Sequence, residues 1–148
     1  MNFSIIIPLF NEKLNISDLV DEIFFNVKSL GFNFELILVN DASTDNTNEI
    51  INYLLIKYKK NIKAINNPIN LGQSFSLIEG IKNSQYETIV TLDGDGQNNP
   101  KDIPILLNKY FSEKDIFLVG GIRKKRKDNK IKMISSKIAN KVREFILK

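Results

Sequence analysis

The sequence predicts an α/β fold in which helices cover both faces of a mostly parallel central sheet. Two observations lead to this prediction. Short runs of apolar, β-branched residues alternate along the chain with longer segments whose apolar residues recur at helical spacing. Several of the runs end in polar loops, as strands do at the edge where parallel sheets bind ligands. At 148 residues, the chain is long enough for one domain with its own hydrophobic core.

Five apolar runs predict the strands of this sheet. They are short, rich in Ile, Val, Leu and Phe, and bounded by Pro, Gly, Asn or Asp. Pro8 stops the first run, and the fourth run leads directly into Asp93. In chain order, the expected strands cover residues 3–7, 34–39, 62–65, 88–92 and 115–119.

A helix is expected after each of these strands. The first helix carries Leu19, Ile23 and Val27 on one stripe, and Gly31 supplies its C-terminal stop. The carboxylate of Asp45 is expected to cap the second helix. In chain order, the expected helices cover about residues 15–30, 46–59, 70–82, 100–111 and 131–147.

The composition excludes several kinds of chemistry. The chain has no cysteine and no histidine, which removes disulfides, thiol nucleophiles, Cys/His metal sites and Ser-His-Asp triads. Any metal ion must therefore be held by oxygen ligands, and any general base must be a carboxylate, a lysine or a tyrosine. The first strand is not followed by a glycine-rich phosphate loop, which argues against a dinucleotide enzyme or a P-loop NTPase.

No targeting or membrane-spanning segment is expected. Met1 leads directly into an apolar strand with no basic stretch before it. No apolar run approaches the roughly 18 residues that a membrane-spanning helix needs. We therefore expect a cytoplasmic protein.

The net charge of +4 is divided unevenly along the chain. Residues 123–148 carry eleven Lys or Arg against two acidic residues, a net of +9, whereas residues 1–122 carry ten against fifteen, a net of −5. We expect a basic loop that continues into an amphipathic helix over 131–147, within the same domain. Its basic face suits an anionic surface such as the inner face of a membrane. The alternative is a helix that packs on the sheet and turns its basic face to solvent.

A nucleic-acid partner is not expected for this basic tail. The chain has no DNA- or RNA-binding motif, and the basic run lacks the interleaved aromatic residues that stack on bases.

The loop after the fourth expected strand is the strongest candidate for a functional site. One glycine separates Asp93 from Asp95, and Gln97 follows, so hard oxygen donors crowd a single loop. Two carboxylates this close repel each other unless a cation lies between them, and oxygen ligands suit Mg²⁺ or Mn²⁺. The hypothesis is a divalent ion that holds a substrate diphosphate. The alternative is a solvated acidic turn.

Two further polar loops are expected at the same edge of the sheet. They cover residues 8–12 and 41–45 and follow the first and second strands. Because the carboxyl ends of parallel strands meet at one edge, these loops and residues 93–97 should line one site. Three polar loops at one edge are a stronger signal than any of them alone.

Five motifs make the sequence resemble a family-2 glycosyltransferase, most closely the dolichyl- or polyprenyl-phosphate sugar transferases. They occur in the family's order over essentially the whole chain, at residues 7–12, 39–45, 70–73, 92–100 and 120–123. The resemblance implies the Rossmann-like GT-A fold, a sandwich of helices around a central sheet. It implies that residues 1–122 form a domain that binds a nucleotide sugar, continuous with the basic loop and helix of 123–148.

The resemblance also implies a role for each matched side chain. Asp95 and Arg123 are the implied catalytic residues. The side chains implied to bind the nucleotide sugar are Pro8, Phe10, Glu12, Asp41, Asp93 and Arg123. Those implied to surround a Mg²⁺ or Mn²⁺ ion on the donor diphosphate are Asp93, Asp95 and Gln97.

The residues by themselves leave alternatives open for several of these roles. In the alternative to a binding role, Pro8 only ends a strand, and Phe10 is part of the core. Asp41 would bond its own loop. Glu12 and Arg123 would be solvated charges.

The function that the resemblance implies is metal-dependent transfer of a sugar from a nucleoside-diphosphate sugar to a polyprenyl phosphate. A cation and an arginine would stabilise the leaving diphosphate, and a lipid phosphate is already an anionic nucleophile that needs no general base. Family members continue into an acceptor-binding half. The alternative is therefore a truncated, non-catalytic nucleotide-sugar-binding or partner subunit, acting with another subunit or as a homo-oligomer. A nucleotidyltransferase is a weaker rival, because residues 11–13 do not form its glycine-rich basic loop.

Overall fold

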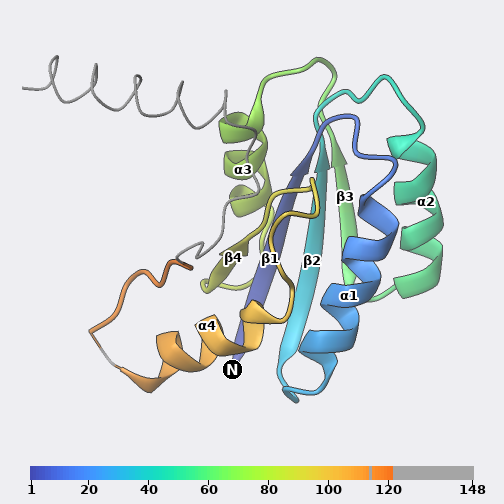
Figure 1. Ribbon diagram of the computed structural model, residues 1–148. Coiled ribbons are helices and arrows are strands. Elements are labelled where there is room, and N and C mark those ends of the chain that lie inside the picture. Colours follow the sequence, from blue (N-terminus) through green and yellow to red (C-terminus); the bar gives the residue numbers. More distant parts are fainter. Residues whose placement is uncertain (114, 122–148) are drawn as a thin grey trace, which may run out of the picture.

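The computed structural model describes residues 1–113 and 115–121 of the chain. Within them, four strands form one parallel sheet in the order β3-β2-β1-β4 (Figure 1). The strands are β1 (Asn2–Leu9), β2 (Asn33–Asn40), β3 (Ile62–Asn66) and β4 (Ile89–Thr91). The mostly parallel sheet predicted from the sequence is therefore confirmed, with each of the first four strands within two residues of its expected bounds.

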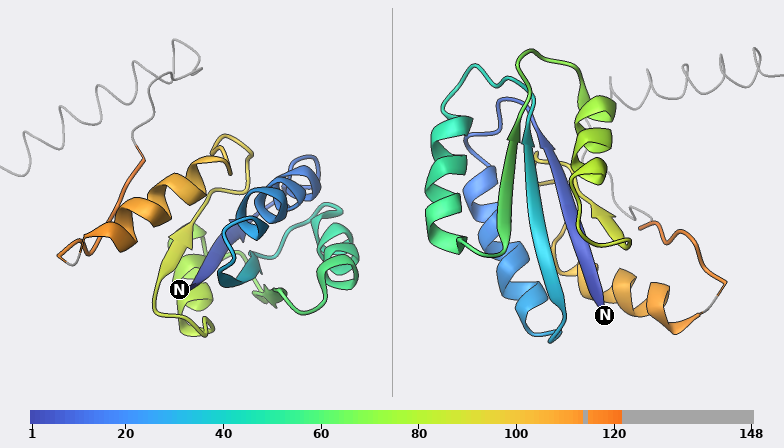
Figure 2. Two further views of the ribbon diagram at one scale, coloured as in Figure 1. Left: turned by 90° about the horizontal axis from the view of Figure 1, so that it is seen from below. Right: turned by 180° about the vertical axis from the view of Figure 1, so that it is seen from behind.

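Helices cover both faces of this sheet, as predicted. Three helices lie on one face, and α3 lies on the other, as the views from below and behind make clear (Figure 2). The helices are α1 (Ile16–Lys28), α2 (Thr47–Tyr58), α3 (Gln73–Lys82) and α4 (Asp102–Ser112). None of the helices in the described ranges is long and apolar enough to cross a lipid bilayer.

The alternation of side chains along β1 divides the core into two unequal parts. Phe3, Ile5 and Ile7 point into a large cluster formed with α1, α2 and α4. Ile6 points the other way, into a small cluster with Ile37 and its neighbours under α3. Central strands buried on both faces read as continuous apolar runs, which is why the sequence pattern identified β1 and β2 clearly.

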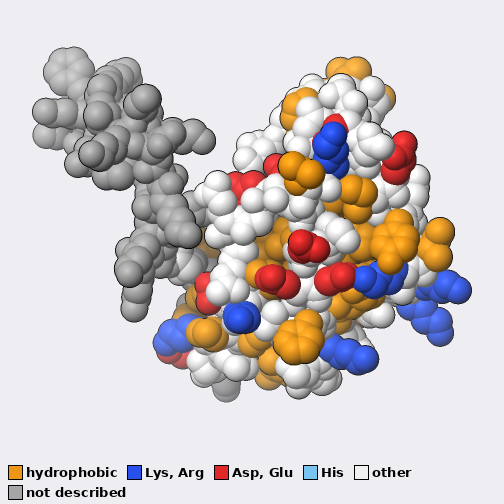
Figure 3. Space-filling view, turned by 45° about the vertical axis from the view of Figure 1, so that its right-hand side comes forward, with side chains coloured by type: hydrophobic (Ala, Val, Ile, Leu, Met, Phe, Trp, Pro, Cys, Tyr) orange, Lys and Arg blue, Asp and Glu red, His pale blue; other side chains and the backbone are white. Residues whose placement is uncertain are grey.

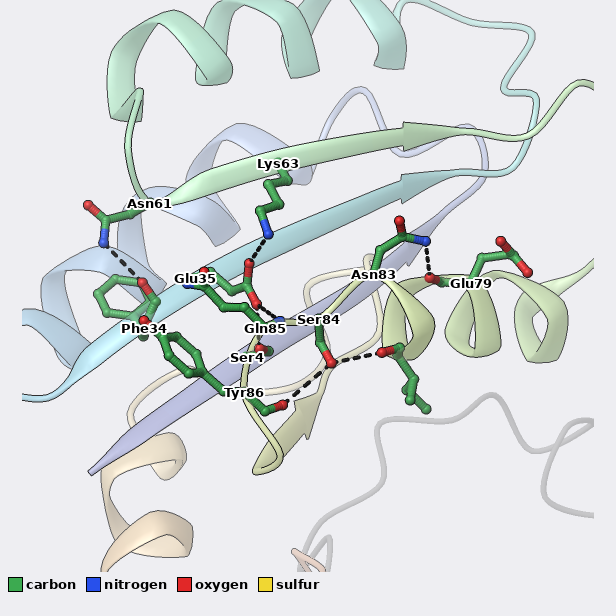
Figure 4. Close-up of polar contacts among 11 residues, drawn as sticks. Ser4, Phe34, Glu35, Asn61, Lys63, Glu79, Asn83, Ser84, Gln85 and Tyr86 are labelled. Atoms are coloured by element: carbon green, nitrogen blue, oxygen red, sulfur yellow. Dashed lines mark hydrogen bonds and ion pairs between the residues drawn. The ribbon is translucent and has the colours of Figure 1, made fainter.

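The buried carboxylate of Glu35 joins the start of β4 to the middle of the sheet (Figure 4). The hydroxyl of Ser4 and the N–H of Gln85 each donate to its Oε1 at 2.6 Å, and Lys63 Nζ lies 2.6 Å from Oε2. Burial alone raises the pKa of Glu35, but these donors outweigh burial and hold its pKa below the ordinary value. This network fixes the turn from which β4 starts.

The strand expected over residues 115–119 is not formed. This segment is irregular, and Phe117 and Leu118 are 92% and 88% exposed. It lies beside β4 across a cavity of about 540 Å³ and pairs with no described strand. β4 is the edge strand of the sheet, but Phe117 and Leu118 have no covering layer among the described residues, and a strand is stabilised by packing of its side chains. The helix expected over 131–147 lies outside the described residues.

The side of the molecule that carries α1 and α2 mixes acidic, basic and hydrophobic side chains (Figure 3). Phe25 and Ile56 are 81% and 69% exposed on these two helices. Between these two helices, the carboxylate of Asp21 accepts hydrogen bonds from Lys57 Nζ at 2.8 Å and from the hydroxyl of Tyr58 at 2.5 Å. These bonds join α1 to α2.

Candidate functional site

A cavity of about 340 Å³ opens at the carboxyl ends of β1, β2 and β4. This is the edge at which the sequence placed the three polar loops. No Lys or Arg among the described residues lines the cavity, although four carboxylates do. The lining residues are Pro8, Leu9, Phe10, Glu12, Asp41, Gln73, Ser76, Asp93, Gly94 and Asp95.

The β1 side of the cavity is formed by residues around the end of the strand. Pro8 is buried within β1, opposite Val39, and the strand continues to Leu9, so Pro8 does not end it. Phe10 follows the strand and is 45% exposed, so it is not a core residue. Glu12 is partly buried and accepts a hydrogen bond from Asn15 Nδ2 at 2.9 Å.

The loop after β1 is bonded to the loop after β2. Asn11 adopts a φ of 59° and accepts the N–H of Thr44 at 2.8 Å, while its own N–H donates to Ser43 Oγ at 3.0 Å. Asp45 Oδ1 accepts the N–H of Thr47 at 3.0 Å. Asp45 thus bonds the first residue of α2, but Asn46 occupies the N-cap position that was expected for Asp45. These bonds give one wall of the cavity a fixed shape.

Asp41 lies at the base of the cavity and is almost fully buried. Its Oδ1 accepts from Asn67 Nδ2 at 2.7 Å and from the N–H of Leu71 at 2.9 Å. Its Oδ2 accepts the N–H of Gly72 at 2.7 Å. Burial alone raises the pKa of Asp41, but these donors outweigh it and hold the pKa below the ordinary value. The carboxylate therefore holds the turn before α3 and does so in its ionised form.

The acidic loop after β4 forms the opposite wall. Asp93 is partly buried, and its two oxygens accept from Gln73 Nε2 at 2.7 Å and Asn98 Nδ2 at 3.2 Å. Asp95 is exposed, and its Oδ1 accepts the backbone N–H of Gln97 at 3.0 Å. Gln97 itself does not line the cavity.

Gly94 allows this acidic loop to approach β1. A Cβ at this position would lie 2.6 Å from Leu9 Cδ2 and 3.2 Å from the carbonyl oxygen of Pro8. Leu9 is buried and the carbonyl belongs to the strand, so neither can move away easily. Only glycine lets Asp93 and Asp95 lie this close to the end of β1.

The donor chemistry fits a hard divalent cation. Within residues 1–113 and 115–121, no three acidic side chains converge on one point that a metal ion could occupy. Two neighbouring carboxylates are nevertheless the usual protein contribution to a Mg²⁺ or Mn²⁺ ion that takes its other ligands from water and phosphate. Glu12, Asp41, Asp93 and Asp95 also make the cavity strongly negative. An anionic ligand would therefore need a cation to enter it.

The structure brings most of the expected site residues together and adds Leu9, Gln73, Ser76 and Gly94. Pro8, Phe10, Glu12, Asp41, Asp93 and Asp95 all line the cavity, whereas Arg123 and the rest of the tail lie outside the described residues. Of these added residues, Gln73 is the one whose side chain bonds to Asp93. It belongs to one of the five motifs, and its place just after Gly72, at a helix start near the rim, is the signal that could have identified it.

Comparison with known proteins gives consistent results for sequence and fold. The model of the family described as glycosyl transferase family 2 matches residues 4–148. An undecaprenyl-phosphate 4-deoxy-4-formamido-L-arabinose transferase from Shewanella sediminis is 32% identical over 139 residues, which cover 94% of this chain and 41% of that protein. A dodecaprenyl-phosphate galacturonate synthase from Rhizobium johnstonii is 33% identical over 128 residues, which cover 86% of this chain and 38% of that protein.

Two solved structures share the fold at lower identity. A mannosyltransferase from Pyrobaculum calidifontis, in complex with GDP-Man and Mn²⁺, aligns with a TM-score of 0.64 at 20% identity and covers 76% of this chain and 32% of that one. Glucosyl-3-phosphoglycerate synthase from Mycobacterium tuberculosis, in complex with UDP, also aligns with a TM-score of 0.64 at 20% identity and covers 84% of this chain and 45% of that one.

These matches confirm the GT-A fold that the resemblance implied. The chain spans about two fifths of the length of the curated relatives it matches. The family model, in contrast, matches nearly all of the chain. The chain belongs to glycosyl transferase family 2.

Proposed function

We propose that the chain binds a nucleoside-diphosphate sugar in the 340 Å³ cavity and serves in metal-dependent transfer of the sugar to a polyprenyl phosphate. The observation that carries the proposal is that one cavity brings together Glu12, Asp41, Asp93 and Asp95 from three separate loops. No Lys or Arg among the described residues lines this cavity. Such a cavity suits a ligand that enters together with a divalent cation.

The nucleoside is assigned to the β1 and β2 side of the cavity. Phe10 is 45% exposed and presents a ring on which a base can stack, and Pro8 lines the same cavity. Asp41 is held ionised and supplies an acceptor for N–H or hydroxyl groups of the base or ribose. Glu12 lies on the same side and contributes a second acceptor.

The diphosphate is assigned to the β4 side. Asp95, with Asp93 and Gln97 of the same loop, would hold Mg²⁺ or Mn²⁺, which when bound stabilises the negative charge of the leaving diphosphate. Arg123 is proposed to contact a donor phosphate from outside the described residues. The Pyrobaculum calidifontis mannosyltransferase, solved with GDP-Man and Mn²⁺, supports this combination of donor and metal.

The names of the sequence relatives support a polyprenyl phosphate as the acceptor, since they refer to undecaprenyl and dodecaprenyl phosphates. A phosphate oxygen would attack the sugar carbon while the bond to the diphosphate breaks. Because a phosphate is already anionic, no side chain must remove a proton from it. The +9 charge of residues 123–148 supports contact of this tail with an anionic membrane at its cytoplasmic face.

Calorimetric titration of GDP- and UDP-sugars, with and without Mn²⁺, tests the donor site. We expect the wild-type chain to bind one class of nucleotide sugar with Mn²⁺, and Asp95→Ala to lose the metal-dependent part of that affinity. A folded wild-type chain that binds no nucleotide sugar would overturn the proposal. Sugar transfer to a polyprenyl phosphate then separates a transferase from a nucleotide-sugar-binding subunit, which binds the donor but produces no glycolipid.

A further inference from the structure

The turn that begins α3 is bonded to Asp41, at the base of the cavity, and to Asp93, in the acidic loop. The N–H groups of Leu71 and Gly72 donate to the two oxygens of Asp41 at 2.9 and 2.7 Å. The next residue, Gln73, donates from its side-chain Nε2 to Asp93 Oδ1 at 2.7 Å. Three consecutive residues therefore connect the proposed nucleoside side to the proposed diphosphate side.

This turn has a defined conformation. Gly72 adopts a φ of 88°, in the region that favours glycine, and its carbonyl accepts the N–H of Ser76 at 3.1 Å in the first turn of α3. The buried hydroxyl of Ser76 accepts from Asn67 Nδ2 at 3.1 Å, and Asn67 also donates to Asp41. The side chain of Gln73 thus extends from a turn held on several sides.

The bond from Gln73 orients Asp93 without neutralising it. Both Asp93 oxygens accept from uncharged amides, Gln73 and Asn98. Neutral donors fix the direction of a carboxylate, while its negative charge stays available to a cation. A lysine or arginine in the same place would cancel part of that charge.

We propose that Gln73 is a positioning residue that couples nucleotide binding at Asp41 to cation binding at the acidic loop. A ligand that bonds to Asp41 acts on the carboxylate that holds the Leu71–Gln73 turn, and the turn presents Asp93 in the orientation that favours a cation. By reciprocity, the cation favours the nucleotide to the same extent. The inference rests on the proposed donor site and adds to it a residue that acts through Asp93.

A linkage experiment measures this coupling directly. The affinity of UDP and GDP is determined calorimetrically with and without Mn²⁺, and the ratio of the two affinities is the coupling factor. We expect Gln73→Ala to keep the metal-free nucleotide affinity within about twofold and to reduce the coupling factor by about tenfold, the usual size for one hydrogen bond to a charged group. Gln73→Glu, which places an acceptor against Asp93, should reduce it at least as much. Ser74→Ala, the exposed neighbour, is the matched control.

A merely structural role for Gln73 predicts a different result. The melting temperature and the metal-free nucleotide affinity would then fall together, with an unchanged coupling factor, and the inference would be wrong. It would also be wrong if Gln73→Ala behaved like Ser74→Ala in every titration. If the wild-type chain bound neither nucleotide, the proposed donor site would fail. Titration with Mn²⁺ alone would then decide the role of Gln73. The inference requires Mn²⁺ to bind more weakly to Gln73→Ala than to Ser74→Ala, and equal affinities would overturn it.

Discussion

Gly80 of α3 lies so close to Ile6 of β1 that a Cβ on the glycine would stand 2.3 Å from Ile6 Cγ2. The same Cβ would lie 3.3 Å from Cγ2 of Val39 in β2. This close approach sets the position of α3 on its face of the sheet. It therefore also sets the position of the turn that reaches Asp41 and Asp93.

Gly80→Ala is expected to destabilise the protein. Overpacking typically costs about 1–3 kcal/mol, and the better helix propensity of alanine returns up to about 1 kcal/mol. We expect the free energy of unfolding, measured with urea, to fall by about 1–2 kcal/mol. Gly120→Ala is the control, because a Cβ there meets no atom within 4 Å. Equal stability of the two variants would mean that α3 does not pack as closely as described.

Gly94→Ala is expected to impair metal-dependent binding more than stability. The new Cβ would collide with Leu9 and approach the Pro8 carbonyl, so the acidic loop should move outward. We expect the affinity for a nucleotide sugar in the presence of Mn²⁺ to fall by about tenfold or more, equal to about 1.4 kcal/mol. Titration calorimetry measures this, with Ser74→Ala, at an exposed residue, as the control. Wild-type affinity in Gly94→Ala would contradict the placement of the loop.

The buried Glu35 makes stability depend on pH. Its pKa is lowered in the folded chain relative to an ordinary value of 4.5, so its contribution is complete above that value and is lost as the pH falls through the folded pKa. We expect urea midpoints to decrease as the pH falls below about 4.5, and Glu35→Gln to decrease less steeply over the same range. At neutral pH, Glu35→Gln should cost about 1–3 kcal/mol, because Lys63 loses its ionic partner.

The interpretation fails if Glu35→Gln and the wild-type chain lose stability in parallel below that pH. Glu49→Gln, a change at an exposed acid in the first turn of α2, is the control for a general charge effect.

Asp41→Asn is expected to damage both the fold and the ligand site. An amide cannot accept all three hydrogen bonds, and its NH₂ group would face an N–H donor from Leu71 or Gly72. Leaving a buried donor unsatisfied costs about 1–3 kcal/mol, which we expect in urea unfolding. Nucleotide binding without metal should fall by about tenfold or more. Asp18→Asn, at an exposed acid in the first turn of α1, should change neither quantity.

Local patterns in the sequence predicted most of the fold. The buried runs of β1 and β2 and the apolar stripe of α1 are local signals, and the structure places these elements close to their expected bounds. The strand expected at 115–119 is absent, although the edge strand β4 lies beside this segment, because its apolar side chains are not covered by any described element. Pairing depends on tertiary structure, which a local pattern does not contain.

Local patterns likewise predicted one part of the candidate site, and the other part depends on tertiary structure. The three polar loops could be placed at one edge because each follows a strand, and the carboxyl ends of parallel strands lie at the same edge of a sheet. The partners of Asp41 could not be predicted, because Leu71 and Gly72 are about thirty residues away and donate from the backbone. The role of Gln73 was missed for a similar reason, since its bond to Asp93 spans twenty residues.

The pairing of β1 with β4 has a consequence for the order of folding. The pairing of β1 with β2 starts with Asn2 opposite Asn33. In the pairing of β1 with β4, Ser4 lies opposite Ile89, which is 85 residues further along the chain. Closing a longer loop costs more entropy before any contact repays it. We therefore expect β1, β2 and β3 to assemble with α1 and α2 first, and β4 to join last. The acidic loop is carried by β4, so a nucleotide and its cation would act on the final step of assembly and slow the first step of unfolding.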